Sequence, residues 1–358
     1  MKTMIKNISL LLCAAVTLAS CERKPLYDDC SCYSTLSIPI DVDWETSGVT
    51  PEKNVTVLVY NSNDGSLYYE YTYEHNDNDI QSYISLGSGS YTAVVFNEKR
   101  DQVDYVSCVG YENLSTLKFE SNAAEEVLRS RSTTRNYVQQ PGDLAVAVVE
   151  GIVITDDMIV EGYNEEGTKS TSSATKATVE SLTGVTPLKK NTTINIVAHV
   201  DNLFYANSPA LADLVNLADG YYAYGDSNSS TTSTLQFKMG DFVFDDPDSY
   251  FNGSLSGTVT AFGTLESRTS TSGHDSNPVM LDILFQQIDA AGTETPLVMD
   301  VTNYITFTNN SDGSVTIDIE VTFEEALPEV QPDGSSGSSG LGSNVAEWEK
   351  VDVPLNQD

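Results

Sequence analysis

Basic residues and histidine are scarce in this chain. Its 358 residues include 18 Lys and Arg against 52 Asp and Glu, which gives a formal net charge of −34, and only three histidines. An electrostatic field of this sign repels nucleic-acid phosphates and anionic lipid headgroups, so neither is expected as a partner. The acidity by itself is typical of a well-solvated exterior.

Motifs that carry catalysis are missing as well. His75, His199 and His274 lie in separate contexts, and no H-E-x-x-H, G-x-S-x-G, P-loop or G-x-G-x-x-G pattern occurs. Residues 61–65 and 309–313 have the composition of calcium loops, but no bidentate Glu follows, so both are expected to be turns. With 52 acidic residues, carboxylate pairs are unavoidable and none stands out. We expect no enzyme, no metal site and no cofactor.

The apolar runs are too short to cross a bilayer, which takes about 20 residues. The longest follows Lys2 and Lys6 and ends in Leu18-Ala19-Ser20-Cys21, the pattern of a bacterial lipoprotein signal peptide. Processing would remove residues 1–20 and leave a lipid on Cys21. The alternative is an ordinary secretory peptide with an incidental cysteine.

Three of the five cysteines would then remain available for other chemistry, because Cys13 leaves with the signal peptide and Cys21 carries the lipid. Cys30, Cys32 and Cys108 permit one disulfide at most, from Cys30 or Cys32 to Cys108, in an oxidising compartment. Cys-x-Cys alone is a weak metal signal, since no second ligand pair accompanies it.

Hydrophobic residues alternate with a period of two, which is typical of half-buried strands. The stripe Leu36, Ile38, Ile40, Val42 and Trp44 is the clearest case. Further strands are expected at 55–59, 67–73, 91–96, 106–109, 114–119, 144–154, 194–200, 235–244, 255–265, 279–288, 297–301, 304–307 and 315–323. Two short helices are also expected, at Asn122–Leu128 from a capping pattern and at Ser208–Leu217 from a Ser-Pro start.

Composition divides the chain into five parts. We expect a signal peptide over 1–20, a β-sandwich domain over 21–160, a polar linker over 161–177, a second β-sandwich domain over 178–330, and a Gly/Ser-rich tether with a tail over 331–358. Trp348, Val351, Val353 and Leu355 return as apolar residues in that tail. They indicate a candidate strand for a sheet edge of the same domain or another subunit, or else a disordered tail.

Two tyrosine clusters are candidate binding surfaces. Tyr69, Tyr71 and Tyr73 alternate on one expected strand with Tyr68 beside them, and Tyr221, Tyr222 and Tyr224 form a second group. Aromatic packing on a half-buried sheet explains both clusters, and we favour it over a platform for glycans.

The stretch Cys21-Glu22-Arg23-Lys24-Pro25-Leu26-Tyr27, followed by the strand that ends in Asp41-Val42-Asp43-Trp44, resembles the fimbrillin-like lipoproteins of Bacteroidetes, which include fimbrial anchor subunits. Residues 194–203 and 208–222 are similar to the opening of that family's C-terminal domain. The resemblance implies an all-β protein of two tandem transthyretin-like β-sandwich domains with short helical insertions. It also implies a lipid-fixed place in the outer membrane and assembly with pilin subunits by strand exchange.

Pilins of that family lose an N-terminal strand to an Arg-specific protease, whereas anchor subunits keep it. No Arg lies between Arg23 and Arg100, so the first strand has no Arg just after it. Arg129, Arg131 and Arg135 are expected on a solvated surface loop. The resulting hypothesis is a lipid-anchored cell-surface structural protein, an anchor or accessory subunit of a fimbria. The alternative hypothesis is a surface glycan-binding lipoprotein.

Overall fold

The protein is almost entirely β. The computed structural model describes residues 35–75, 82–100, 102–129, 132, 134–161, 182, 184–246, 251–264, 277–311 and 313–331. Within these ranges the only α-helix is α2 (Asp156–Glu161), beside short 3₁₀ turns. The predicted all-β class is therefore confirmed. The described part contains no helix long and apolar enough to span a membrane.

The first half of the structure, which extends to residue 189, contains a five-stranded sheet with a two-stranded sheet over one face. The large sheet has the order β10-β9-β5-β2-β3, and β1 pairs antiparallel with β4. The strand bounds are β1 Leu36–Ile40, β2 Asn54–Asn61, β3 Leu67–Glu74, β4 Ser82–Leu86, β5 Gly89–Asn97, β6 Val106–Val109, β7 Lys118–Ser121, β8 Tyr137–Val138, β9 Ala145–Ile154 and β10 Leu188–Lys189.

Strand β2 shows how the first half is layered. Val55, Val57 and Val59 point to the core beneath β1 and β4, while Leu58 and Tyr60 point to a second core on the opposite face. All five side chains are fully buried. A central strand covered on both faces reads as a continuous apolar run, as this one does.

The second half is a sandwich whose two sheets share one long strand. The strand order is β18-β17-β12-β15-β16-β11-β20-β19, and β15 crosses from one sheet to the other with a register shift between Gly240 and Val243. The bounds are β11 Thr192–Val200, β12 Ala210–Ala218, β13 Gly220–Tyr222, β14 Ser227–Asn228, β15 Thr232–Phe244, β16 Gly253–Ala261, β17 Met280–Gln286, β18 Glu294–Asp300, β19 Ile305–Asn309 and β20 Val315–Thr322.

Strands from both halves meet in a further sheet, which has four strands in the order β14-β13-β7-β6. Tyr221 of β13 lies opposite Phe119 of β7, and both side chains are buried in one core with Phe262. Gly220 is needed at this crossing, because a Cβ there would stand 2.3 Å from the Phe119 carbonyl oxygen. The junction of the two halves is therefore a packed hydrophobic core.

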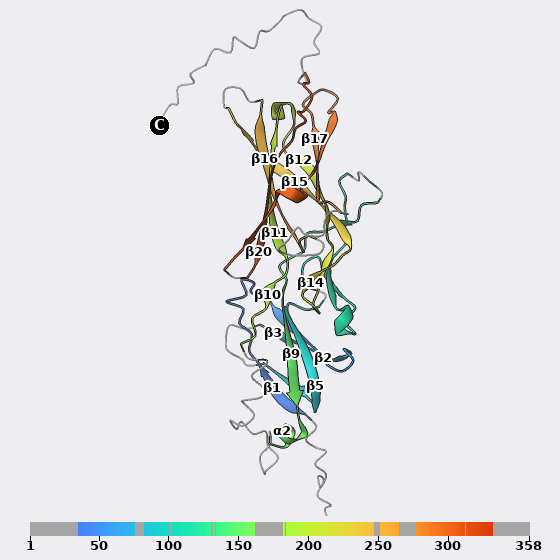
Figure 1. The fold of residues 1–358 in the computed structure, drawn as a ribbon, viewed down its shortest axis with the longest axis vertical. Coiled ribbons are helices and arrows are strands. Elements are labelled where there is room, and N and C mark those ends of the chain that lie inside the picture. The colour runs from blue at the N-terminus through green and yellow to red at the C-terminus, as the bar shows by residue number, and fades with distance from the viewer. Residues whose placement is uncertain are drawn as a thin grey trace, which may run out of the picture.

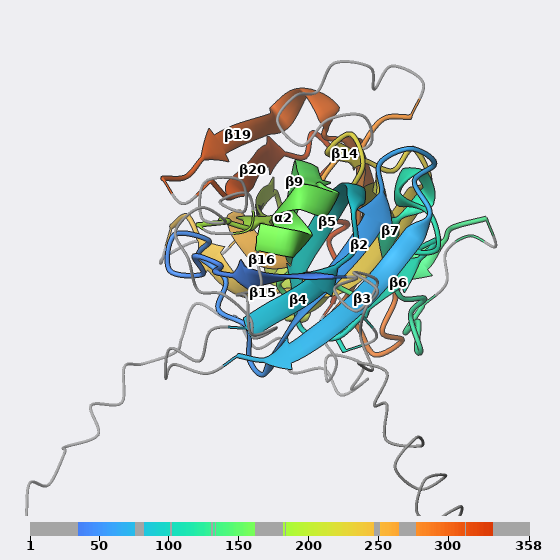
Figure 2. The ribbon, with the colours of Figure 1, turned by 90° about the horizontal axis from the view of Figure 1, so that it is seen from below.

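The molecule is elongated, with the two halves end to end (Figure 1). Strand β1 and helix α2 lie at one pole, and the far ends of β12, β16 and β17 lie at the other. Seen along the long axis, α2 covers the near end of the β9 and β5 sheet (Figure 2). We refer to the pole of α2 as the N-terminal pole and to the opposite end as the distal pole.

Both predicted helices were wrong. Residues 210–218 form β12, which is hydrogen-bonded between β15 and β17. Apolar residues lie on both of its faces, with Ala212 and Leu214 in the core and Leu211 half-buried on the opposite face, so they show no clean alternation. A short apolar run of that kind does not distinguish a strand from a helix. Residues 122–128 form no helix, because their backbone N–H groups bind elsewhere. The Ala124 N–H donates to the Tyr137 carbonyl, and the Leu128 N–H donates to the side-chain oxygen of Gln236.

Candidate functional site

A segment of the first half docks on the outer face of a sheet in the second half. Residues 122–138 extend from β7 to β8, and β8 adds to β15 as a parallel strand with Tyr137 opposite Thr234. Gln236 of β15 accepts from the Leu128 N–H at 2.8 Å and donates to the Arg129 carbonyl at 2.9 Å. We call the described residues of this segment the docking segment.

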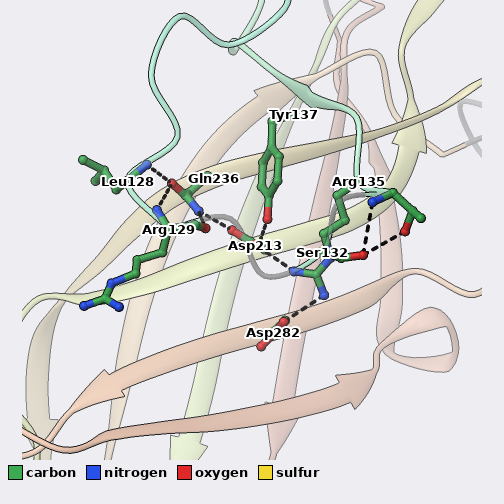
Figure 3. A network of polar contacts seen from close by, with 9 residues as sticks. Leu128, Arg129, Ser132, Arg135, Tyr137, Asp213, Gln236 and Asp282 are labelled. Atoms are coloured by element: carbon green, nitrogen blue, oxygen red, sulfur yellow. Dashed lines mark hydrogen bonds and ion pairs between the residues drawn. The ribbon is translucent and has the colours of Figure 1, made fainter.

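Arg135 fastens the docking segment through two ion pairs. Its Nη1 lies 2.6 Å from Asp213 Oδ2, and its Nη2 lies 2.9 Å from Asp282 Oδ2 (Figure 3). The exposed fraction of the side chain is 18% for Arg135, 2% for Asp213 and 5% for Asp282. Buried ions need partners of this quality, because their desolvation costs several kcal/mol each. We call these three residues the clamp.

The register of β12 and β17 explains why the clamp needs an arginine. Asp213 and Asp282 are directly opposite each other on the two strands, and like charges in that position destabilise a sheet. The planar guanidinium reaches one carboxylate with each terminal nitrogen, which a lysine ammonium does less well. Tyr137 and Gln236 also donate to Asp213, at 2.8 and 2.9 Å.

The clamp corrects the expectation for the arginine cluster. Arg135 is held in a partly buried network rather than on a solvated loop. Arg129 is more exposed, at 59%, and pairs with Glu294, while Arg131 lies outside the described residues. The sequence signal that could have found the clamp is an aspartate inside each of two apolar strands, at Asp213 and Asp282.

A second ion pair, between Lys118 and Asp219, crosses the junction of the two halves. Lys118 Nζ lies 2.9 Å from Asp219 and 3.0 Å from Glu120, and the exposed fraction of its side chain is 10%. Burial lowers the pKa of Lys118, but the hydrogen bonds and charges of Asp219 and Glu120 outweigh it, so the net shift of the pKa is upward. The ammonium form therefore joins β7 to the chain just before β13.

Strand β1 is an integral part of the core in the first half. Leu36, Ile38 and Ile40 are 4%, 0% and 4% exposed and pack with Ile84 and Leu86 of β4. The strand is shorter than its sequence stripe. Val42 instead forms a parallel bridge with Val185, and Trp44 packs in the same core just before a turn.

Most residues predicted from the termini lie outside the described residues. These are the lipidation residue Cys21, the cysteines Cys30 and Cys32, and the candidate donor-strand residues Trp348, Val351, Val353 and Leu355. Cys108 is described and buried in the core shared by the two halves, at 6% exposure. A disulfide between Cys108 and Cys30 or Cys32 stays a prediction.

The tyrosine clusters differ in exposure. Tyr71 and Tyr73 stack at 5.8 Å between ring centroids and pack against the core, whereas Tyr68 and Tyr69 are 44% and 40% exposed. Burial raises the pKa of Tyr73 well above its ordinary value. In the second cluster Tyr221 is fully buried and Tyr224 is 55% exposed, so those rings do not share a surface. Packing accounts for most of both clusters.

Within the described residues no group of three or more His, Cys, Asp or Glu side chains is arranged to hold a metal ion. His199 instead lies beside Glu320 of the neighbouring strand, with Nε2 and Oε1 3.2 Å apart.

The sequence profile of a family described as a domain of unknown function, DUF5119, matches residues 20–238. The chain belongs to this family. The matched range includes Arg135, Tyr137, Asp213 and Gln236 of the docking network and ends before Asp282. No curated protein matches the chain in sequence.

Two solved structures illustrate the likeness in three dimensions. A candidate adhesin from Bacteroides ovatus ATCC 8483 is 18% identical, with 85% of this chain and 97% of that chain covered and a TM-score of 0.53. The fimbrial anchor protein Mfa2 from Porphyromonas gingivalis is 12% identical, with 80% and 90% covered and a TM-score of 0.45. The first similarity shows that the two-part β-sandwich fold occurs in that adhesin-like protein.

Proposed function

We propose that this protein is a lipid-anchored subunit of a fimbria-like surface structure. Cys21 would fix it in the outer membrane, and a terminal strand would join it to a neighbouring pilin-like subunit. The observation that carries this proposal is the placement of the two ends of the described chain at opposite poles (Figure 1). The adhesin-like relative of the same fold and the lipoprotein-like N-terminus support it.

The N-terminal pole suits a membrane anchor. Leu36, the first residue of β1, lies opposite Leu86, the last residue of β4. The chain continues from Leu86 into β5, which begins at this pole. Fourteen residues separate Cys21 from Leu36, which span at most about 50 Å when fully extended. A lipid on Cys21 would hold this pole near the membrane and transmit force directly to a core strand.

The distal pole suits attachment of the next subunit. Strand β20 runs parallel to β11 and ends at this pole. There the backbone N–H groups of Phe323 and Leu327 donate to the backbone carbonyls of His199 and Asp201. Gln287 donates to the Pro328 carbonyl at 2.9 Å and fastens the segment further. Chain beyond residue 331, with the candidate donor-strand residues, would therefore start away from the membrane.

Replacing Cys21 tests the anchor. In Cys21→Ser cells, the protein should move from the outer-membrane fraction to the soluble exported fraction, and attached fibres should be released with it. Cys30→Ser is the matched control and should stay in the membrane. Retention of Cys21→Ser in the membrane would contradict lipid anchoring, and release of the protein with fibres still attached to the cell would contradict an anchoring role in the fibre.

Removing the tail tests strand exchange separately. Deletion of residues 341–358, or the double substitution Val351→Asp and Val353→Asp, should abolish co-purification with the pilin-like partner from the native cells. Main-chain pairing supplies affinity in strand addition, and alternate apolar side chains supply fit, so charges at these positions should prevent docking. Deletion of residues 356–358 is the control. Full co-purification of the double variant would rule out the tail as donor strand.

A further inference from the structure

A groove of about 470 Å³ lies where the docking segment meets the second half. Its volume is within the range of small-molecule sites, about 300 to 1,000 Å³. Its apolar lining residues are Ala124, Leu128, Val138, Leu211 and Phe237. Its polar lining residues, which we call the rim, are Tyr105, Glu125, Glu126, Gln139, Gln140, Gln236 and Lys238. The groove depends on the clamp, because both halves of the chain line it.

Tyr105 is held at the rim in a strained backbone conformation. Its φ is +57°, in the left-handed region that residues other than glycine rarely adopt. Three neighbouring backbone hydrogen bonds fix residues 104–106, among them Asn122 N–H to the Tyr105 carbonyl and Gly142 N–H to the Asp104 carbonyl. The ring is 52% exposed, so backbone hydrogen bonds, and not packing of the side chain, hold Tyr105 in this conformation. Strain of this kind clusters at functional sites.

Several polar rim groups have hydrogen-bonding capacity to spare. Gln140 uses its Oε1 to accept from the Thr260 N–H at 3.1 Å, which leaves its amide N–H groups for a ligand. Within the described residues, no hydrogen bond or ion pair of the Glu125, Glu126, Gln139 or Lys238 side chains is found. Gln236, by contrast, is fully used by the docking segment and by Asp213.

We propose that this groove binds a neutral oligosaccharide, with a sugar ring stacked on Tyr105. An exposed tyrosine offers an apolar face to the C–H groups of a sugar and a hydroxyl at its edge. Carboxamides and carboxylates supply both donors and acceptors for sugar hydroxyls. Glu125, Glu126 and the net charge of −34 disfavour sialylated or sulfated glycans. This binding is independent of lipid anchoring and of strand exchange.

The test uses the full mature chain on an array with neutral hexose- and N-acetylhexosamine-terminated oligosaccharides beside sialylated and sulfated ones. Tyr105→Gly is the decisive variant, since glycine removes the ring but adopts positive φ easily, so folding is preserved. It should weaken binding of a neutral glycan about tenfold. Tyr105→Phe should bind within about threefold of the unmodified protein, because it keeps the stacking face.

Two further variants locate the site. Gln139→Ala should weaken binding, while Tyr224→Ala, which removes an exposed tyrosine on another surface, should leave it unchanged. Unchanged affinity of Tyr105→Gly would overturn the proposal, as would an array with no neutral glycan bound. Saturable binding of acidic glycans alone would overturn it too. So would binding of a partner peptide, and of no neutral glycan, that is lost in the Tyr105 variants.

Discussion

Arg135 and Asp282 are 147 positions apart in the chain, yet Nη2 and Oδ2 of their side chains are 2.9 Å apart. The contact joins a segment of the first half to β17 of the second. The second guanidinium nitrogen reaches Asp213, so one cation neutralises two opposed carboxylates. The two halves are thus joined at the clamp as well as at the shared core.

Arg135→Ala should lower the free energy of unfolding by about 3 to 5 kcal/mol, because it removes the cation that pairs with two buried carboxylates. Arg135→Lys should recover part of this loss, since an ammonium satisfies two carboxylates less well. Urea unfolding followed by circular dichroism measures the change. The control Arg129→Ala, at a largely exposed ion pair, should change stability by less than about 1 kcal/mol. Equal effects at the two arginines would contradict the special role of the clamp.

Ile38→Ala should destabilise the first half by about 2 to 5 kcal/mol, because it opens a cavity at a position with 0% exposure in β1. Ser37→Ala on the opposite face of the same strand should have a much smaller effect. The comparison is made by thermal unfolding of the two purified variants. If Ile38→Ala unfolds like the unmodified protein, β1 is not part of the stable core.

Gly220→Ala should weaken the junction, since the added Cβ would collide with the Phe119 carbonyl, which is backbone and cannot move aside easily. Gly240→Ala is the matched control, because the nearest atom to a Cβ there is 3.9 Å away. Limited proteolysis should cut the Gly220 variant faster. Identical digestion of both variants would show that the junction adapts to a methyl group.

Alkaline pH should destabilise the protein through its buried tyrosines. Burial, together with Tyr68, raises the pKa of Tyr91 to about 12 from its ordinary value of 10.0, and burial also raises the pKa of Tyr60. The unfolded chain loses these protons first, so stability is complete below pH 10 and falls as the pH rises toward 12.

The melting temperature measured from pH 8 to pH 12 should reveal this fall, and Tyr91→Phe should reduce it. Tyr224→Phe, at an exposed position, is the control for the general effect of rising negative charge. A slope that is the same in both variants would show that Tyr91 contributes nothing to the alkaline loss.

Several strands of this protein were predictable from sequence. Alternation or bounding turns located β2, β3, β6, β9 and β20 closely, even though β2 is buried on both faces. β12 was missed because both of its faces carry apolar residues and a Ser-Pro pair precedes it, which together resemble the start of a helix. α2 was missed because its six residues lie next to the polar linker and carry little periodicity.

The candidate sites were much less predictable. Alternation pointed to β1 as a core strand. The aspartates inside two apolar strands, Asp213 and Asp282, indicate a buried polar partner, but the sequence does not identify that partner as Arg135. The contact depends on the register of the two strands and on the path of the docking segment across them. The conformation of Tyr105 has no sequence signal either, because a tyrosine at positive φ arises from its neighbours' hydrogen bonds.

The shared core also constrains how the chain folds after export. The N-terminal half emerges first, but one of its two hydrophobic cores includes Ala218, Tyr221, Ala223 and Phe262. That core stays incomplete until about three quarters of the chain has been delivered. A nascent chain should therefore expose Phe96 and Phe119 during secretion, which makes it a substrate for holding chaperones up to that point.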